Sequence, residues 1–284
     1  MSRQSRRTFI TQSAALLSAS KLVFARDPLK ASNLGVQLYT VRNVIGKDPA
    51  ATLKAIQDIG YTEVEATSDN LDEIWSALQA TRLKPISIHI GRADENNMDA
   101  ALSKFKEHGF EYVVIPSYEL AKNGAEGVKR AAEMMNKMGE QAKAKGLTLC
   151  YHNHAHDLQP VDGTPALHML LEQTQKDLLF LEMDIFWMSV AGHDPVKALQ
   201  AHSGRVPLVH LKDKAKGVPT QYNEHVPHSA FKEVGSGSID IPAVLSAADA
   251  AGVKHYFVEQ DQTPGDPVAS LRQSFKYLSG HFGS

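Results

Sequence analysis

The sequence predicts a single α/β domain folded as a (β/α)8 barrel, the TIM-barrel fold. Eight short apolar runs alternate with amphipathic segments, and each strand-plus-helix unit takes about 25 to 40 residues, as in such barrels. Glycines recur at the turns before strands, and Asp-Pro pairs recur where helices begin. No linker or shift in composition divides residues 27–284, so we expect one domain over this range.

The apolar runs predict strands because a parallel sheet is buried on both faces and its strands read as nearly continuous apolar segments. In chain order they are residues 34–39, 62–66, 85–90, 112–115, 147–152, 179–184, 206–212 and 255–259. An open, doubly wound sheet is the alternative, but it usually has a glycine-rich turn after its first strand. Tyr39-Thr40-Val41-Arg42 is not such a turn.

Helix boundaries are marked by residues with known terminal preferences. An Asp-Pro pair places a capping carboxylate before a proline that suits the first helical turn. Such pairs predict helix starts at Asp48, Asp194 and Asp266. Glycine at a helix C-terminus adopts the left-handed conformation that ends the helix. Glycines that precede predicted strands are Gly60, Gly109, Gly146 and Gly252.

Composition excludes several classes of protein. The formal net charge is -2 over 284 residues, so no basic footprint for nucleic acid is present. Cys150 is the one cysteine, and an intrachain disulfide therefore cannot form. The 13 histidines are the prominent feature, because histidine is the commonest metal ligand in proteins.

Residues 1–26 are predicted to be a twin-arginine signal peptide. Arg6 and Arg7 precede a weakly apolar run, residues 10–24, that is too short and too polar to span a membrane. Val23-Phe24-Ala25 then offers a small-residue cleavage site. We expect a periplasmic protein, exported folded and without stable membrane insertion. A disordered basic N-terminus is the alternative.

Polar residues gather where the predicted strands end. In a (β/α)8 barrel these carboxyl ends build the active site, and a buried charge without a partner is costly. The residues in question are Gln37, Tyr39, Glu65, His89, His152, His154, Asp184, His210, Lys212 and Glu259. Their recurrence at equivalent positions predicts a functional site rather than isolated core groups.

Four consecutive strands supply a candidate metal site. Two imidazoles and two carboxylates give a mixed nitrogen and oxygen donor set, which suits Mn, Co, Zn or Fe better than Ca. The predicted ligands of one divalent metal ion are His152, Asp184, His210 and Glu259. His154 lies on the same side of its strand as His152 and is the alternative ligand.

Five segments resemble the sugar phosphate isomerase/epimerase family of xylose isomerase-like barrels. They are Tyr151-His152-Asn153-His154, Met183-Asp184-Ile185-Phe186-Trp187, His210-Leu211-Lys212-Asp213, residues 234–240 and Val258-Glu259-Gln260-Asp261. The resemblance implies one divalent metal held by Glu, Asp, His and Glu at the ends of the four strands, and it allows a homodimer. Asp184, His210 and Glu259 match this pattern, whereas His152 stands where the family has glutamate.

That departure bears on the reaction. In the ketose epimerases of this family, two metal-bound glutamates act on opposite faces of the sugar, and of that pair only Glu259 is present here. Either another base serves the second face, for which His154, His89 and Lys212 are candidates, or the reaction is an elimination. Inosose dehydratase is similar to this chain in its Tyr-His-x-His-like segment.

Other residues near the strand ends are predicted to contact substrate. These are Gln37, Tyr39, Glu65, His89, Trp187 and Lys212, with ordinary packing as the alternative for Trp187. The long segment 213–238, which carries His225 and His228, is expected to form a lid or a dimer contact. Its Gly235-Ser236-Gly237-Ser238 run could bind a phosphate through backbone N–H groups.

The first hypothesis is a metal-dependent isomerase or epimerase that abstracts a proton next to the carbonyl of a sugar, keto-sugar or cyclitol. The alternative is a lyase or dehydratase that uses the same site on a keto-sugar, keto-glycoside or inosose. A non-catalytic sugar-binding protein and a phosphoesterase of the endonuclease IV type are less favoured. The expected partner is a small carbohydrate.

Overall fold

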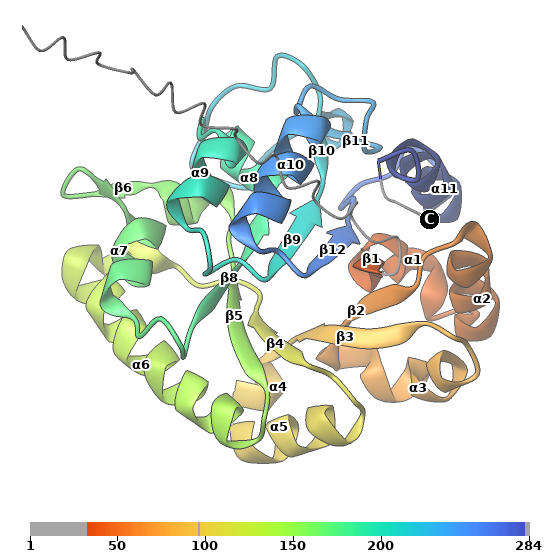
Figure 1. Cartoon of the computed structure of the whole chain (residues 1–284), viewed down its shortest axis with the longest axis horizontal. Helices are drawn as coiled ribbons and strands as arrows, with labels where there is room; N and C mark the ends of the chain where they lie inside the picture. The colour runs from red at the N-terminus through yellow and green to blue at the C-terminus, as the bar shows by residue number, and fades with distance from the viewer. Residues whose placement is uncertain (1–32, 96, 282–284) are drawn as a thin grey trace, which may run out of the picture.

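The computed structural model describes residues 33–281 except residue 96. The predicted signal peptide lies outside the described residues. The predicted closed barrel is confirmed: eight parallel strands pair in the order β1-β12-β9-β8-β5-β4-β3-β2 (Figure 1). Their bounds are β1 Leu34–Gln37, β2 Glu63–Thr67, β3 Lys84–His89, β4 Tyr112–Ile115, β5 Thr148–His152, β8 Phe180–Asp184, β9 Leu208–Leu211 and β12 His255–Val258.

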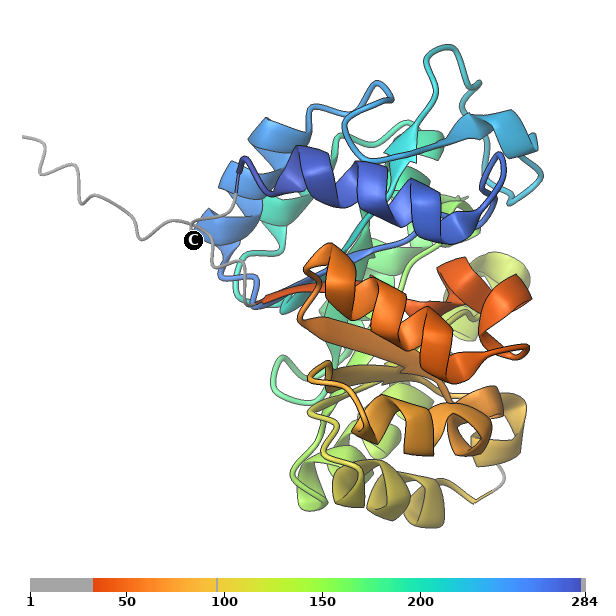
Figure 2. The same cartoon turned by 90° about the vertical axis from the view of Figure 1, so that its right-hand side faces the viewer.

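Helices surround the barrel and cover the outer face of the strands (Figures 1 and 2). The longer ones are α2 Pro49–Ile59, α3 Leu71–Gln79, α5 Met98–Glu107, α6 Gly124–Ala144, α7 Ala166–Gln173, α9 Pro195–Ala201, α10 Ile241–Ala251 and α11 Pro267–Leu278. Short helices α1 Arg42–Ile45, α4 Arg92–Glu95 and α8 Ile185–Val190 follow strands β1, β3 and β8. Within the described part of the chain, no helix has the length and apolar character needed to cross a membrane.

The predicted helix starts are confirmed. The carboxylates of Asp48, Asp194 and Asp266 accept hydrogen bonds from backbone N–H groups at the first turns of α2, α9 and α11. Each satisfies a donor that the helix itself leaves unpaired. The four glycines before strands all have positive φ, between 72° and 122°, where a side chain would be strained.

The interior of the barrel changes in character along its axis. Side chains two residues apart on a strand point to the same face, so Cys150, Leu208 and Phe257 lie below His152, His210 and Glu259. The three apolar residues belong to a buried cluster separate from the main core between strands and helices. The interior is therefore apolar below and changes to charged and polar groups toward the carboxyl ends of the strands.

The seam between β1 and β12 leaves no room for a side chain at Gly35. A methyl group there would lie 2.7 Å from a ring carbon of Phe257 and 2.9 Å from the carbonyl oxygen of Glu63. Because overpacking a core costs about 1–3 kcal/mol, Gly35→Ala is expected to lower the free energy of unfolding by about that much. Gly46→Ala is the control, since nothing lies within 4 Å of the added methyl. Equal urea-unfolding midpoints for the two variants would contradict this packing argument.

Candidate metal centre and active site

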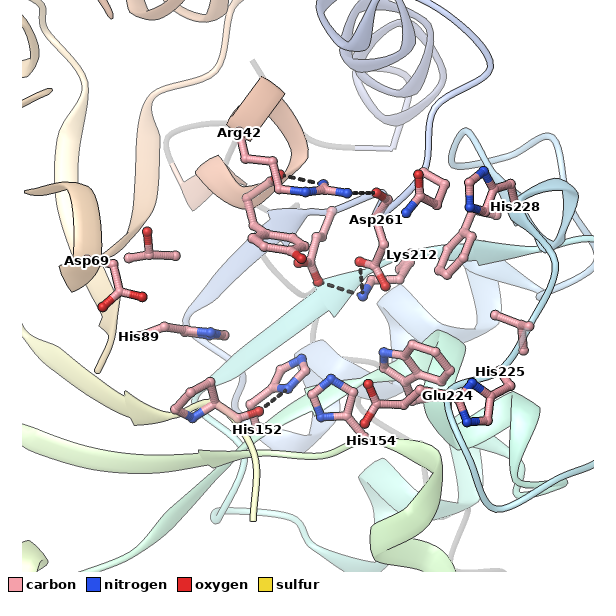
Figure 3. Close-up of a pocket in the computed structure, with 18 of the residues that line it drawn as sticks. Arg42, Asp69, His89, His152, His154, Lys212, Glu224, His225, His228 and Asp261 are labelled. Carbon is pink, nitrogen blue, oxygen red and sulfur yellow. Dashed lines mark hydrogen bonds and ion pairs between the residues drawn. The ribbon is translucent and has the colours of Figure 1, made fainter. Parts of the chain in front are cut away.

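A cavity of about 510 Å³ opens at the carboxyl ends of the strands (Figure 3). Predicted site residues that line it are Tyr39, His89, His152, His154, Trp187, Lys212 and Glu259. Further lining residues, which the sequence analysis did not assign to the cavity, include Arg42, Asp69, Glu224 and Asp261. The structure thus brings residues from both halves of the chain to one cavity.

The four predicted metal ligands converge beside this cavity. One donor atom from each of His152, Asp184, His210 and Glu259 lies within 4.8 Å of the others. His210 Nδ1 is 2.9 Å from Glu259 Oε2, and Asp184 Oδ2 is 3.5 Å from His152 Nε2. Ligand bonds of about 2.1 Å put opposite donors about 4.2 Å apart around a cation. The spacing therefore fits one divalent metal ion.

Two buried ligand atoms that make no hydrogen bond support that fit. His152 Nε2 and Asp184 Oδ2 are buried without a hydrogen-bond partner, although Lys212 Nζ lies 2.9 Å from Asp184 Oδ2 as an ion pair. His152 Nδ1 is 3.2 Å from the Pro116 carbonyl, which can only accept, so Nδ1 carries the proton and Nε2 presents a lone pair. His154 does not belong to the cluster of four, and the geometry favours His152 as the ligand.

Asp184 is positioned by the end of its own strand. It is the last residue of β8 and the N-cap of α8, and its Oδ1 accepts a hydrogen bond of 2.9 Å from Trp187 N. One oxygen is thereby fixed by the helix, and the other faces the cluster. The backbone turn from β8 into α8 sets the direction of this ligand.

The other ring nitrogen of His210, Nε2, contacts a carboxylate that lies deeper in the barrel. Its Nε2 is 2.6 Å from Glu65 Oε1, and Gln37 Nε2 donates to the same oxygen at 2.7 Å. A carboxylate in this position orients the ring and makes the other nitrogen a better ligand. Gln37 and Glu65 are fully buried and do not line the cavity. Their predicted contact with substrate is thus corrected to support of His210.

Glu182 is a site residue that the sequence analysis missed. It is fully buried, and its Oε2 is 2.8 Å from His89 Nε2. Its position two residues before Asp184 was the available signal, because both side chains point into the barrel. Burial disfavours a charged imidazole, but the carboxylates of Glu65 and Glu182 raise the pKa of His89 to about 10.

Lys212 lies among three carboxylates. Its Nζ is 2.9 Å from Asp184 Oδ2, 2.6 Å from Glu259 Oε2 and 2.8 Å from Asp261 Oδ1. Although burial opposes the charge, these carboxylates raise the pKa of Lys212 well above its usual range. An ammonium group has no lone pair, so this charge state does not fit the predicted role of Lys212 as a base.

His154 lines the wall of the cavity (Figure 3). Its ring centroid is 5.5 Å from that of Trp187 and 4.7 Å from that of His152. Burial, and then the neighbouring His152, lower the pKa of His154 well below its ordinary value. The ring is therefore neutral. Trp187 is only 2% exposed, but it borders the cavity as well as the core.

The segment between β9 and α10, predicted to form a lid or a dimer contact, forms part of the wall of the cavity. Glu224, His225 and His228 from this segment line the cavity. Glu224 Oε1 lies 3.0 Å from His156 Nδ1, which connects the segment to the residues after β5.

The backbone N–H groups of the predicted phosphate-binding run, in the same segment, already donate hydrogen bonds within the chain. Asp213 accepts hydrogen bonds from the N–H groups of Gly235, Gly237 and Ile239 at 3.0, 2.8 and 3.2 Å. These donors are used by the chain itself, so they hold the loop in place, and the phosphate hypothesis for this run loses its basis.

Comparison with known proteins agrees with this architecture. Residues 53–280 match the family model described as the xylose isomerase-like TIM barrel. The chain belongs to the xylose isomerase-like TIM barrel family. Within it, the set His152, Asp184, His210 and Glu259 occupies the barrel mouth.

Three similar proteins illustrate the range of this family. An inosose dehydratase of Clostridium perfringens is 29% identical over 160 residues, and the match spans 53% of each chain, about half the length of that relative. A sugar phosphate isomerase/epimerase from Parabacteroides distasonis superposes with a TM-score of 0.74 at 21% identity, over 87% of this chain and 97% of the other. The IOLI protein with a bound zinc atom has a TM-score of 0.70 at 18% identity, over 89% and 100%. The two structural matches show a shared fold.

Removing the carboxylate of Glu65, which contacts His210, is expected to weaken metal binding. Loss of such an outer carboxylate typically costs about 10- to 100-fold in metal affinity, and we expect this for Glu65→Gln. Glu63→Gln is the control, because Glu63 lies on the same strand but pairs with His255 at 2.8 Å instead. Competition with a chromophoric chelator measures both affinities. Equal affinities for the two variants would contradict the role of Glu65.

The contact between His156 and Glu224 is expected to depend on pH. Burial opposes the charge on His156, but Glu224 and Asp157 raise its pKa from 6.5 to about 9. The contribution of this group to stability is complete below pH 6.5 and is lost as the pH rises through about 9. NMR titration should show His156 titrating near pH 9, and near its ordinary value in Glu224→Gln. An unchanged titration in that variant would contradict the pairing.

Proposed function

We propose that this protein is a metal-dependent lyase that removes water from a keto-sugar or a cyclitol ketone. The observation that carries the proposal is the donor set at the cavity: Glu259 borders it as a carboxylate of the cluster, and His152 replaces the second glutamate. Elimination needs one base for the proton next to the carbonyl and one acid for the leaving hydroxyl. The similarity to inosose dehydratases over half their length supports the same choice.

The metal would be held by His152, Asp184, His210 and Glu259. A divalent cation bound there supplies Lewis acidity, which stabilises the negative charge that develops on a carbonyl oxygen. The structurally similar IOLI protein is described with a zinc atom, which supports the proposal that this chain also takes a metal ion.

The protein residues provide a closed proton cycle. Glu259 takes the proton from the carbon next to the carbonyl, and the Lys212 ammonium gives a proton to the leaving hydroxyl, which departs as water. Glu259 Oε2 and Lys212 Nζ are 2.6 Å apart. The proton on Glu259 can therefore pass directly to neutral Lys212, and both groups return to their starting states. His89 and Trp187 shape the cavity around the ring of the substrate.

Epimerisation is the second candidate function, and the position of His154 favours it. His154 follows β5, which β8 and β9 separate from β12 in the barrel order. A neutral imidazole there could exchange a proton on the face opposite Glu259.

For either reaction, residues 1–26 support export to the periplasm by the twin-arginine route.

Deuterium labelling distinguishes the two reactions. With metal-loaded protein in D2O and a panel of inososes and keto-sugars, we expect a product that has lost one molecule of water, identified by mass spectrometry and NMR. A product with deuterium at an inverted carbon and no loss of water would establish the epimerase. Absence of both changes for every ketone would exclude both functions.

Variants test the assigned roles. Lys212→Met removes the proton donor and keeps all four metal ligands, so kcat should fall by about 10²- to 10⁴-fold while the metal content stays at one per chain. Glu140→Gln, on the exposed face of α6, is the control with full activity. Unchanged turnover by Lys212→Met would refute the proton cycle.

A further inference from the structure

A second cavity, of about 620 Å³, adjoins the active-site cavity. The two share Glu224 and His225 as lining residues, and Figure 3 shows both residues on the same side of the pocket as His154. Ligand pockets in proteins typically measure about 300–1,000 Å³. The second cavity is therefore large enough for a unit that continues from a molecule in the first.

The second cavity has a polar lining. The residues that line this cavity and not the first come from the turn after β4, from the residues after β5 and from the segment between β9 and α10. Those with polar side chains are Ser117, Glu119, Lys122, His156, Gln159 and Asn223. Ala121 is the one apolar residue among those described at this cavity. Such a surface offers hydrogen-bond donors and acceptors to hydroxyl groups.

The charges in this lining are paired within it. Lys122 forms an ion pair with Glu119, and His156 forms one with Glu224. A phosphate or carboxylate would have to displace one of these carboxylates to reach a cation. The lining therefore favours an uncharged ligand with many hydroxyl groups.

We propose that the second cavity is a subsite for a further, uncharged sugar unit, so that the substrate is a keto-sugar joined to a second sugar by a glycosidic bond. This inference rests on the proposed function, because it places the ketone-bearing ring in the first cavity. Glu224 and His225 lie where the two units meet. Exposed tyrosines at positions 118 and 222 adjoin lining residues and offer ring faces at the rim.

Binding of unreactive sugars tests the subsite independently of turnover. Isothermal titration of the metal-loaded protein with glucose, cellobiose and maltose should give at least tenfold tighter binding for one of the disaccharides. Equal dissociation constants for glucose and both disaccharides would overturn the proposal.

Two serine variants locate the effect. Ser117→Trp fills the second cavity and should abolish the preference for the disaccharide, whereas Ser76→Trp on the exposed face of α3 should retain it. Gln159→Ala adds no bulk and should reduce the preference between about two- and tenfold, as loss of one hydrogen bond does. A preference that survives both Ser117→Trp and Gln159→Ala would overturn the proposal.

Turnover separates this inference from the proposed function. The 3-keto derivatives of glucose and of the preferred disaccharide are compared in D2O. If neither loses water, the lyase proposal fails, and the binding ratio still decides whether the subsite exists. If both lose water with equal kcat/KM, the lyase stands and the subsite is refuted.

Discussion

The imidazole of His210 joins two layers of buried charge, and the arrangement of the site depends on it. Its Nδ1 faces Glu259 and the candidate metal cluster, while its Nε2 faces Glu65 in the layer below. Two carboxylates on opposite edges of one fully buried ring fix its orientation. Because an unpaired carboxylate in the barrel interior would be costly, the contacts of His210 with Glu65 and Glu259 stabilise both layers.

The barrel creates these layers through strand alternation. On β8, Glu182 contributes to the lower layer and Asp184 to the upper one, because residues two apart point inward. The apolar cluster that contains Leu208 and Phe257 closes the interior beneath them. Glu65, Glu182 and Asp184 above this cluster are fully buried, so electrostatic interactions among these groups are stronger than in water.

The cavity above differs in character from its floor. Lys212 is balanced by three carboxylates, and Asp213 occupies the N–H groups of the glycine-serine loop. No phosphate site is thus left free on this loop. Paired charges at the mouth and in the adjoining cavity suit neutral, hydroxyl-rich molecules. The donor set beside the cavity holds two imidazoles, His152 and His210, and two carboxylates, Asp184 and Glu259.

The sequence by itself determined the eight strands, the helix caps and the convergence of His152, Asp184, His210 and Glu259. These follow from local periodicity, from capping chemistry and from the rule that parallel strands end together at one face of a barrel. Only the tertiary structure decided that Gln37 and Glu65 lie beneath His210, that Lys212 is paired with Asp261, and that Glu224 reaches His156. Those contacts depend on the register between strands and on the path of a long loop, which place residues far apart in the chain within a few ångströms of one another. Neither the register nor the path of the loop leaves a periodic signal in the sequence. Burial inside the barrel removes these charged groups from water, and they therefore pair with one another.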